Sequence, residues 1–129
     1  MTMLQGTAES GANVLSQACP SRAALELVAG KWPLLVIPAL APGPLRNNEL
    51  LRRVEGISQK VLSQTLRELA RNGLVLREDH GTVPPHVEYR LSPLGQSLSE
   101  TLIALDRWAE RHHDALRQAR EDFDAAFLP

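Results

Sequence analysis

The sequence predicts a mostly α-helical protein with a small β-hairpin wing, arranged as a winged helix-turn-helix with an additional long C-terminal helix. Leu62, Leu66 and Leu69 recur at helical spacing and form one apolar stripe. The following stretches, 74–76 and 87–91, indicate the two strands of a hairpin, because apolar residues alternate with charged ones in the second of them. A helix followed directly by a hairpin with a charged tip is the plan of a winged helix.

The N-terminal third is predicted to contain a tail and two helices. Residues 1–17 are rich in Gly, Ser, Thr and Ala without periodicity, which indicates a mobile tail or a loosely docked arm. Pro20 suits the first position of a helix that ends near Gly30. A second, apolar helix is expected to open at Lys31–Trp32–Pro33 and to continue through Leu40.

Two short helices joined by a tight turn form the predicted helix-turn-helix. The first is expected from about Asn47 to Val54, and the turn follows around Gly56. Ser58 is a candidate N-cap of the second helix, and Asn72–Gly73 is expected to end it. In a DNA-binding helix-turn-helix, this second helix lies in the major groove.

The face of the second helix opposite the leucines is polar and basic. Gln and Ser side chains can bond base edges, whereas Lys and Arg can hold phosphate or guanine. Most faces of this composition are ordinary solvated surface, so the interpretation depends on the surrounding sequence. The candidate DNA-contacting residues at this helix are Ser58, Gln59, Lys60, Ser63, Gln64 and Arg67.

The net charge of −1 conceals an uneven distribution along the chain. Residues 44–77 contain seven basic and three acidic groups, whereas residues 78–129 contain five basic and ten acidic groups. The middle of the chain should therefore attract a polyanion such as DNA, and Arg46 and Arg77 are further candidate contacts.

A last, long helix is predicted to begin at Ser92–Pro93. Its apolar residues follow steps of three and four, and this stripe is longer than the small preceding core can cover. We expect the surplus to pack against a second copy of the chain in a homodimer. The domain organisation is thus a tail (1–17), a winged helix-turn-helix (18–91), and a dimerisation helix with an acidic tail (92–129). The candidate interface residues are Leu98, Leu102, Leu105 and Trp108.

The sequence offers little other chemistry. No Gly-rich phosphate loop and no nucleophile elbow is present, so neither an enzyme nor a cofactor is expected. His80 and His86 flank a turn and could approach each other, but no cysteine pair accompanies them and no metal site is expected. No run approaches the roughly 18 apolar residues of a membrane span. The absence of a secretory signal and the single cysteine favour a cytoplasmic location.

Several motifs stand out along the chain, namely Cys19–Pro20, Gly30–Trp32, Arg46–Leu50, Gly56–Ser63, Leu66–Leu69, Asn72–Val75, Pro84–Tyr89 and Leu91–Gly95. These motifs resemble the HxlR family of MarR-like bacterial winged-helix transcriptional regulators. They occur in order between residue 19 and about residue 113, with the spacing of the family. The resemblance implies a dimeric, sequence-specific DNA-binding regulator that acts on an inverted-repeat operator. Its wing, here with His86 and Arg90, would touch the flanking DNA backbone.

Departures from the family pattern concern three positions. Asn47 stands where the family usually has Phe, so a core anchor is missing or supplied elsewhere. His80 and His86 replace the usual Tyr and Arg, which removes a permanent positive charge from the wing.

The resemblance also draws attention to Cys19. Some family members sense oxidants or electrophiles through a cysteine near the N-terminus, so Cys19 is a candidate switch for an oxidant or small-molecule effector. The alternative interpretation of Cys19 is a small buried side chain that packs and never reacts. The alternative for the whole chain is a winged-helix protein-interaction module without sequence-specific DNA binding.

Overall fold

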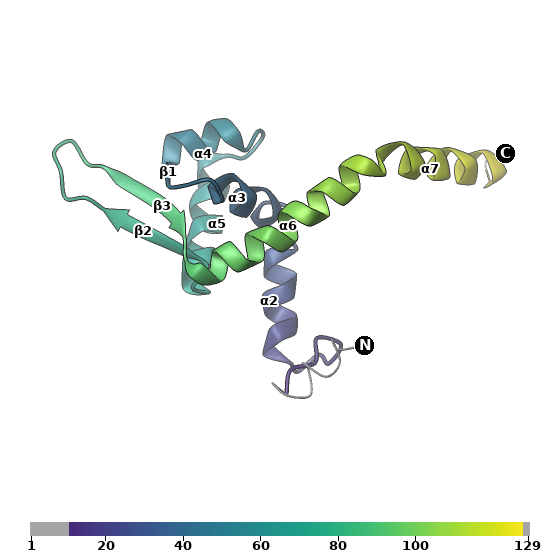
Figure 1. The fold of residues 1–129 in the computed structure, drawn as a ribbon, viewed down its shortest axis with the longest axis horizontal. Coiled ribbons are helices and arrows are strands. Elements are labelled where there is room, and N and C mark those ends of the chain that lie inside the picture. The colour runs from purple at the N-terminus through teal and green to yellow at the C-terminus, as the bar shows by residue number, and fades with distance from the viewer. Residues whose placement is uncertain (1–10, 128–129) are drawn as a thin grey trace.

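A computed structural model describes residues 11–127 and confirms the winged helix-turn-helix. In Figure 1, a compact body of α3, α4 and α5 carries the β2–β3 wing on one side and the α6–α7 arm on the other, while α2 projects in a third direction. The elements of the described residues are α2 (Pro20–Val28), α3 (Pro33–Leu40), β1 (Leu45–Arg46), α4 (Asn47–Arg53), α5 (Gln59–Arg71), β2 (Val75–Asp79), β3 (Val87–Leu91), α6 (Pro93–Arg111) and α7 (His113–Phe127).

The core forms where α5 and α3 meet the sheet. Leu62, Leu66 and Leu69 are buried as their spacing predicts, so the opposite face of α5 is left to solvent. From α3, Val36 and Ile37 are fully buried. Each such side chain contributes about 1.5–3 kcal/mol when it leaves water, so these residues hold α5 in a fixed orientation.

The turn of the helix-turn-helix has the features that the sequence predicts. Gly56 has a φ of 89°, which is favourable for glycine and strained for other residues. Ser58 follows as N-cap, and its Oγ accepts a hydrogen bond of 3.1 Å from the Val61 N–H. At the other end of α5, Gly73 has a φ of 73° and the helix stops at Asn72, as expected.

The sheet has three antiparallel strands in the order β1-β3-β2, one strand more than the sequence indicated. Strand β1 contains only two residues, which is too short to show an alternating pattern. In the hairpin, Arg77 pairs with Tyr89 and Glu78 pairs with Glu88. This register decides which wing side chains share a face.

Helix α6 packs closely against the end of the hairpin. Ser92 caps it as predicted, because its Oγ accepts from the Gly95 N–H at 3.0 Å and donates to the Gly73 carbonyl at 2.6 Å. Gly95 is buried, and a Cβ at this position would collide with the Leu74 carbonyl oxygen. The start of α6 is therefore fixed to the loop that ends α5.

The C-terminal region differs from the single long helix with an acidic tail that the sequence predicted. The helix breaks at His112, whose Nδ1 lies 2.8 Å from the Trp108 carbonyl oxygen, and α7 follows. Acidic residues of the expected tail support α7 instead, since Arg117 pairs with Asp114 at 3.4 Å and with Glu121 at 3.3 Å. Pairs at this spacing stabilise a helix.

The described part of the predicted N-terminal tail lies against α2, while residues 1–10 of that prediction lie outside the described residues. The Arg22 guanidinium donates to the Leu15 carbonyl at 3.3 Å, and the Asn13 N–H donates to Cys19 Sγ at 3.3 Å. Among residues 11–127 no single helix is long and apolar enough to cross a membrane, and α2 and α3 reach that length together only across a 76° bend.

Candidate DNA-binding surface

The outward face of α5 presents three exposed side chains with free hydrogen-bonding groups. Lys60, Gln64 and Arg67 lie opposite the buried leucines, where the sequence predicted them. None of the three forms a hydrogen bond or an ion pair with another residue of the described range 11–127. Their donors and acceptors are therefore available to an external partner.

Gln59 and Ser63, which the sequence placed at the margin of this face, are engaged within the protein. The Asn47 side-chain N–H donates to Gln59 Oε1 at 2.6 Å, and the Gln59 N–H donates back to Asn47 Oδ1 at 3.1 Å. A second Gln59 N–H donates to Ser63 Oγ at 2.9 Å. Asn47, where the sequence suggested a missing core anchor, thus ties α4 to the start of α5.

Arg46 connects the helix-turn-helix with the wing. Its backbone N–H donates to Glu49 Oε1 at 2.8 Å, which helps to cap α4. Its guanidinium Nη2 donates to the Pro85 carbonyl at 3.4 Å. Arg46 is exposed, so its other N–H groups remain available for a phosphate contact.

The wing does not present all of its predicted DNA-contacting residues on one surface. Strand alternation places Arg77 on the face of Tyr89, and Arg90 on the opposite face. Arg77 is exposed and forms no ion pair with another residue in the part of the chain that the structure describes. Arg90 contacts Glu78 through Nε at 3.0 Å, so part of its charge is balanced locally.

The two wing histidines approach each other, as the sequence suggested, and Glu88 joins them. His80 Nε2 lies 3.1 Å from Glu88 Oε1, and His86 Nε2 lies 3.3 Å from Glu88 Oε2. The neighbouring imidazole of His86, and after it that of His80, lowers the pKa of the Glu88 carboxyl from its usual value. Sequence analysis missed Glu88, although its position two residues after His86 put both on one face of β3.

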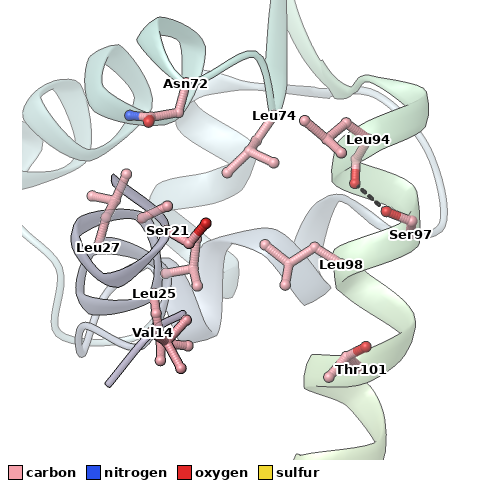
Figure 2. A pocket seen from close by; sticks show the side chains of 12 residues that line it. Val14, Ser21, Leu25, Leu27, Asn72, Leu74, Leu94, Ser97, Leu98 and Thr101 are labelled. Carbon is pink, nitrogen blue, oxygen red and sulfur yellow. Dashed lines mark hydrogen bonds between the residues drawn. The ribbon is translucent and has the colours of Figure 1, made fainter. Parts of the chain in front are cut away.

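An apolar groove of about 480 Å³ separates α2 from the first half of α6. In Figure 2, Leu94 and Leu98 of α6 line one side of this groove, and residues of α2, Leu25 and Leu27 among them, line the other. No residue of α2 is buried. The described chain therefore leaves apolar surface of both helices uncovered.

The predicted dimer-interface residues divide between this surface and the core. Leu105 and Trp108 are 50% and 46% exposed, and Leu98 is half-buried at the edge of the groove. Leu102 is only 5% exposed within one chain. Leu102 faces the core together with Gly95 and Ser99, because the helical periodicity of α6 places these three residues on one side.

Cys19 lies immediately before α2 and is partly exposed. The Asn13 N–H that donates to its sulfur lowers the pKa of the thiol from its usual value, because the bond stabilises the thiolate. The environment of Cys19 therefore differs from the fully buried, inert packing residue of the alternative interpretation.

The tight turn between α4 and α5, the solvent-facing basic side of α5 and the hairpin together define a winged helix-turn-helix protein. The HxlR-like helix-turn-helix family model matches residues 27–117, so the chain belongs to the HxlR family of transcriptional regulators. The uncharacterized HTH-type transcriptional regulator YtfH of Escherichia coli is 38% identical over 110 residues, which cover 85% of this chain and 87% of that protein.

Solved structures agree with this assignment. YtfH of Salmonella typhimurium is similar with a TM-score of 0.79 and 38% identity, covering 85% of this chain and 98% of that one. The redox regulator HypR in its reduced form is similar with a TM-score of 0.71 and 34% identity, covering 77% of this chain and 98% of that one.

Proposed function

We propose that this protein is a sequence-specific DNA-binding transcriptional regulator that inserts α5 into the major groove. The observation that supports this most is the free outward face of α5, where Lys60, Gln64 and Arg67 have no partner among the described residues. Opposite charges three or four residues apart on a helix can pair with each other, and none of these three side chains forms such a pair within the described residues. Here the three side chains point away from the body together.

The chemistry of these side chains suits base and phosphate recognition. The Gln64 amide can donate to and accept from adenine, while Arg67 and Lys60 can bond guanine or phosphate. The Asn47–Gln59 pair fixes the start of α5 and leaves Gln59 a positioning role beside the reading face. Arg46 would bind a phosphate of the DNA backbone at the place where the helix-turn-helix meets the wing.

We further propose that two copies act together. Apolar side chains of α2 and α6 line the groove in Figure 2, and Leu105 and Trp108 of α6 are exposed as well, so a second chain of the same kind would cover apolar surface here. A two-fold axis through this contact would relate two α5 helices, so the operator would be an inverted repeat.

DNA binding can be tested with purified protein and the DNA upstream of its own and neighbouring genes. We expect footprinting to find an inverted repeat. A Lys60→Ala and Arg67→Ala double variant should lose most operator affinity, because it removes both basic groups of the reading face. Gln64→Ala should weaken the free energy of operator binding by about 1–3 kcal/mol and relax sequence specificity at one base position.

The matched control is Arg107→Ala, which removes a positive charge from the exposed side of α6 and should leave affinity unchanged. The salt dependence of binding should flatten in the double variant and not in the control. Unchanged operator affinity in the double variant would contradict the proposal and would favour the protein-interaction module.

Regulation by oxidants is a second proposal, supported by the thiolate-stabilising contact at Cys19 and by the similarity to HypR. With one cysteine in the chain, oxidation would end in a sulfenic acid, a mixed disulfide with a small thiol, or a bridge between subunits. Peroxide should change operator affinity in the wild type and not in Cys19→Ser. An equal response of both proteins, or of neither, would make Cys19 structural.

A further inference from the structure

His80, His86 and Glu88 form a compact cluster at the base of the wing tip that the proposed reading face of α5 does not use. His80 directly follows β2, and His86 directly precedes β3. The His80 N–H donates to the His86 carbonyl at 2.9 Å, so the two backbones are fixed opposite each other. Glu88 lies two residues further along β3, on the same face of the hairpin as His86.

The side chains of this cluster converge through their ligating atoms. The ring centroids of the two histidines lie 4.7 Å apart with an interplanar angle of 73°, so the rings meet edge to face. One nitrogen of each ring and a carboxylate oxygen of Glu88 all lie within 4.8 Å of one another. Each histidine directs Nε2 at the carboxylate, at 3.1 Å for His80 and 3.3 Å for His86.

The His86 Nε2 atom is the least satisfied member of the cluster. It is buried from solvent and forms no hydrogen bond within residues 11–127, although Glu88 Oε2 lies 3.3 Å away. A buried imidazole nitrogen without a partner loses the hydrogen bond that water would supply. A ligand placed between this nitrogen and its two neighbours would compensate for that loss.

We propose that His80, His86 and Glu88 bind one divalent transition-metal ion of the zinc class. Zinc binds imidazole nitrogen and carboxylate oxygen at about 2.0–2.2 Å, which separates neighbouring ligand atoms in a tetrahedral site by about 3.3 Å. The two nitrogen–oxygen distances, 3.1 Å to Oε1 and 3.3 Å to Oε2 of Glu88, are close to this length but end on different oxygens. Because one ligand atom of each residue lies within 4.8 Å of the other two, a rotation of the side chains would bring both nitrogens and one oxygen around a single ion.

The ligand set discriminates between classes of metal ion. Two imidazoles favour zinc, cobalt, nickel or copper over magnesium and calcium, which prefer oxygen ligands. The nearest further carboxylate on this face is Glu78, opposite Glu88, and it is held by Arg90 at 3.0 Å. The site therefore has three protein ligands, and water would take the fourth position beside the partly exposed His80.

A bound ion would connect the two strands of the wing at the point where the turn leaves them. His80 directly follows β2, whereas His86 directly precedes β3 and Glu88 lies within it. The metal as well as backbone hydrogen bonds would hold the two strands together next to the turn. Because the unfolded chain does not bring these residues together, metal binding should raise the melting temperature.

The test uses the untagged, full-length protein and Zn²⁺ or Co²⁺ alone. We expect calorimetric titration with Zn²⁺ to give one ion per chain with micromolar or tighter affinity, and an increase in Tm. Co²⁺ should give the visible absorption bands of a tetrahedral site, and Mg²⁺ should produce neither signal. Glu88→Gln and His86→Gln, which change exposed or partly exposed side chains, should each weaken Zn²⁺ binding at least about tenfold.

Two control proteins separate this site from other metal-binding groups of the chain. A His112→Gln and His113→Gln double variant removes the other two histidines, and Cys19→Ser removes the thiol. Both should retain wild-type Zn²⁺ affinity and stoichiometry. Circular dichroism and Tm without metal verify that each wing variant is folded.

The proposal is overturned if the wild type takes up no Zn²⁺ below millimolar concentration. It is also overturned if folded Glu88→Gln and His86→Gln variants bind as the wild type does. None of these measurements uses DNA, so the metal site and the DNA-binding function can fail independently.

Discussion

Asn47 and Gln59 form a reciprocal pair of amide hydrogen bonds between α4 and α5, with distances of 2.6 and 3.1 Å. An amide can complete two parallel hydrogen bonds only with a partner of complementary donor and acceptor geometry. The pair therefore sets the distance between the first helix of the motif and the N-terminal turn of the reading helix. Its energetic contribution is open to a direct test.

We predict that Asn47→Ala and Gln59→Ala destabilise the protein non-additively. A double-mutant cycle on the free energy of unfolding should give a coupling of about 0.5–1.5 kcal/mol, the usual net value of a hydrogen bond. Asn48→Ala, an exposed neighbour, serves as control and should show no coupling with Gln59→Ala. Additive effects of Asn47→Ala and Gln59→Ala would mean that the contact does not contribute to the position of α5.

A second prediction at this scale concerns the ionisation of Cys19. The Asn13 N–H lowers the pKa of the thiol, so the thiolate persists to lower pH than in an unperturbed cysteine. The rate of alkylation by iodoacetamide should therefore rise with pH through a midpoint below that of a free thiol. Asn13→Pro removes the N–H and should move the midpoint upward, whereas Asn13→Ala keeps the N–H. Equal midpoints in the Pro variant and the wild type would exclude this contact as the cause.

At the scale of elements, the start of α6 is one of the contacts that hold the wing to the body. Helix α6 packs against α3 and β3, and Ser92 bonds the Gly73 carbonyl at the end of α5. Gly95 allows this approach because it has no side chain at the Leu74 carbonyl. A helical glycine is normally unfavourable, so its presence in α6 reflects packing rather than helix propensity.

We predict that Gly95→Ala destabilises the protein by about 1–3 kcal/mol, because the added methyl group forces α6 away from the Leu74 carbonyl. Helix propensity alone would give the opposite sign, a gain of roughly 0.5–1 kcal/mol. Denaturant unfolding measures the difference, and Gln96→Ala, on the exposed side of the same turn, is the matched control. A stabilised Gly95→Ala protein would show that α6 can shift freely.

At the scale of the whole molecule, the α6–α7 arm and α2 extend away from the body with apolar side chains exposed on both (Figure 1). Leu25, Leu105 and Trp108 are each about half exposed, and Phe123 and Phe127 of α7 are 62% and 72% exposed. A chain that leaves so many large apolar residues in water gains by association.

We predict that Leu105→Asp converts a dimer into a monomer with reduced operator affinity, because it places a charge in the proposed interface. Sedimentation velocity at micromolar concentration measures the first effect, and DNA titration measures the second. Arg107→Asp introduces the same negative group on the other side of α6 and should remain dimeric. A monomeric wild type under these conditions would rule out the proposed assembly.

The sequence by itself determined the helix-turn-helix and the outward face of α5. The leucine spacing, the Ser58 cap and the Asn72–Gly73 stop are local signals, because each depends on residues within a few positions along the chain. The structure confirms all three. Lys60, Gln64 and Arg67 follow from the same spacing, since a helix with one buried face must expose the other.

Only the tertiary structure decided which of the other polar side chains are engaged by contacts within the protein and which can bind a partner. Asn47 with Gln59, Arg90 with Glu78 and His80 with Glu88 are pairings between elements or across a strand register. The short β1 and the inward turn of Leu102 likewise depend on where neighbouring elements lie. Such contacts join positions whose distance is set by packing and not by local spacing, so no periodicity in the sequence encodes them.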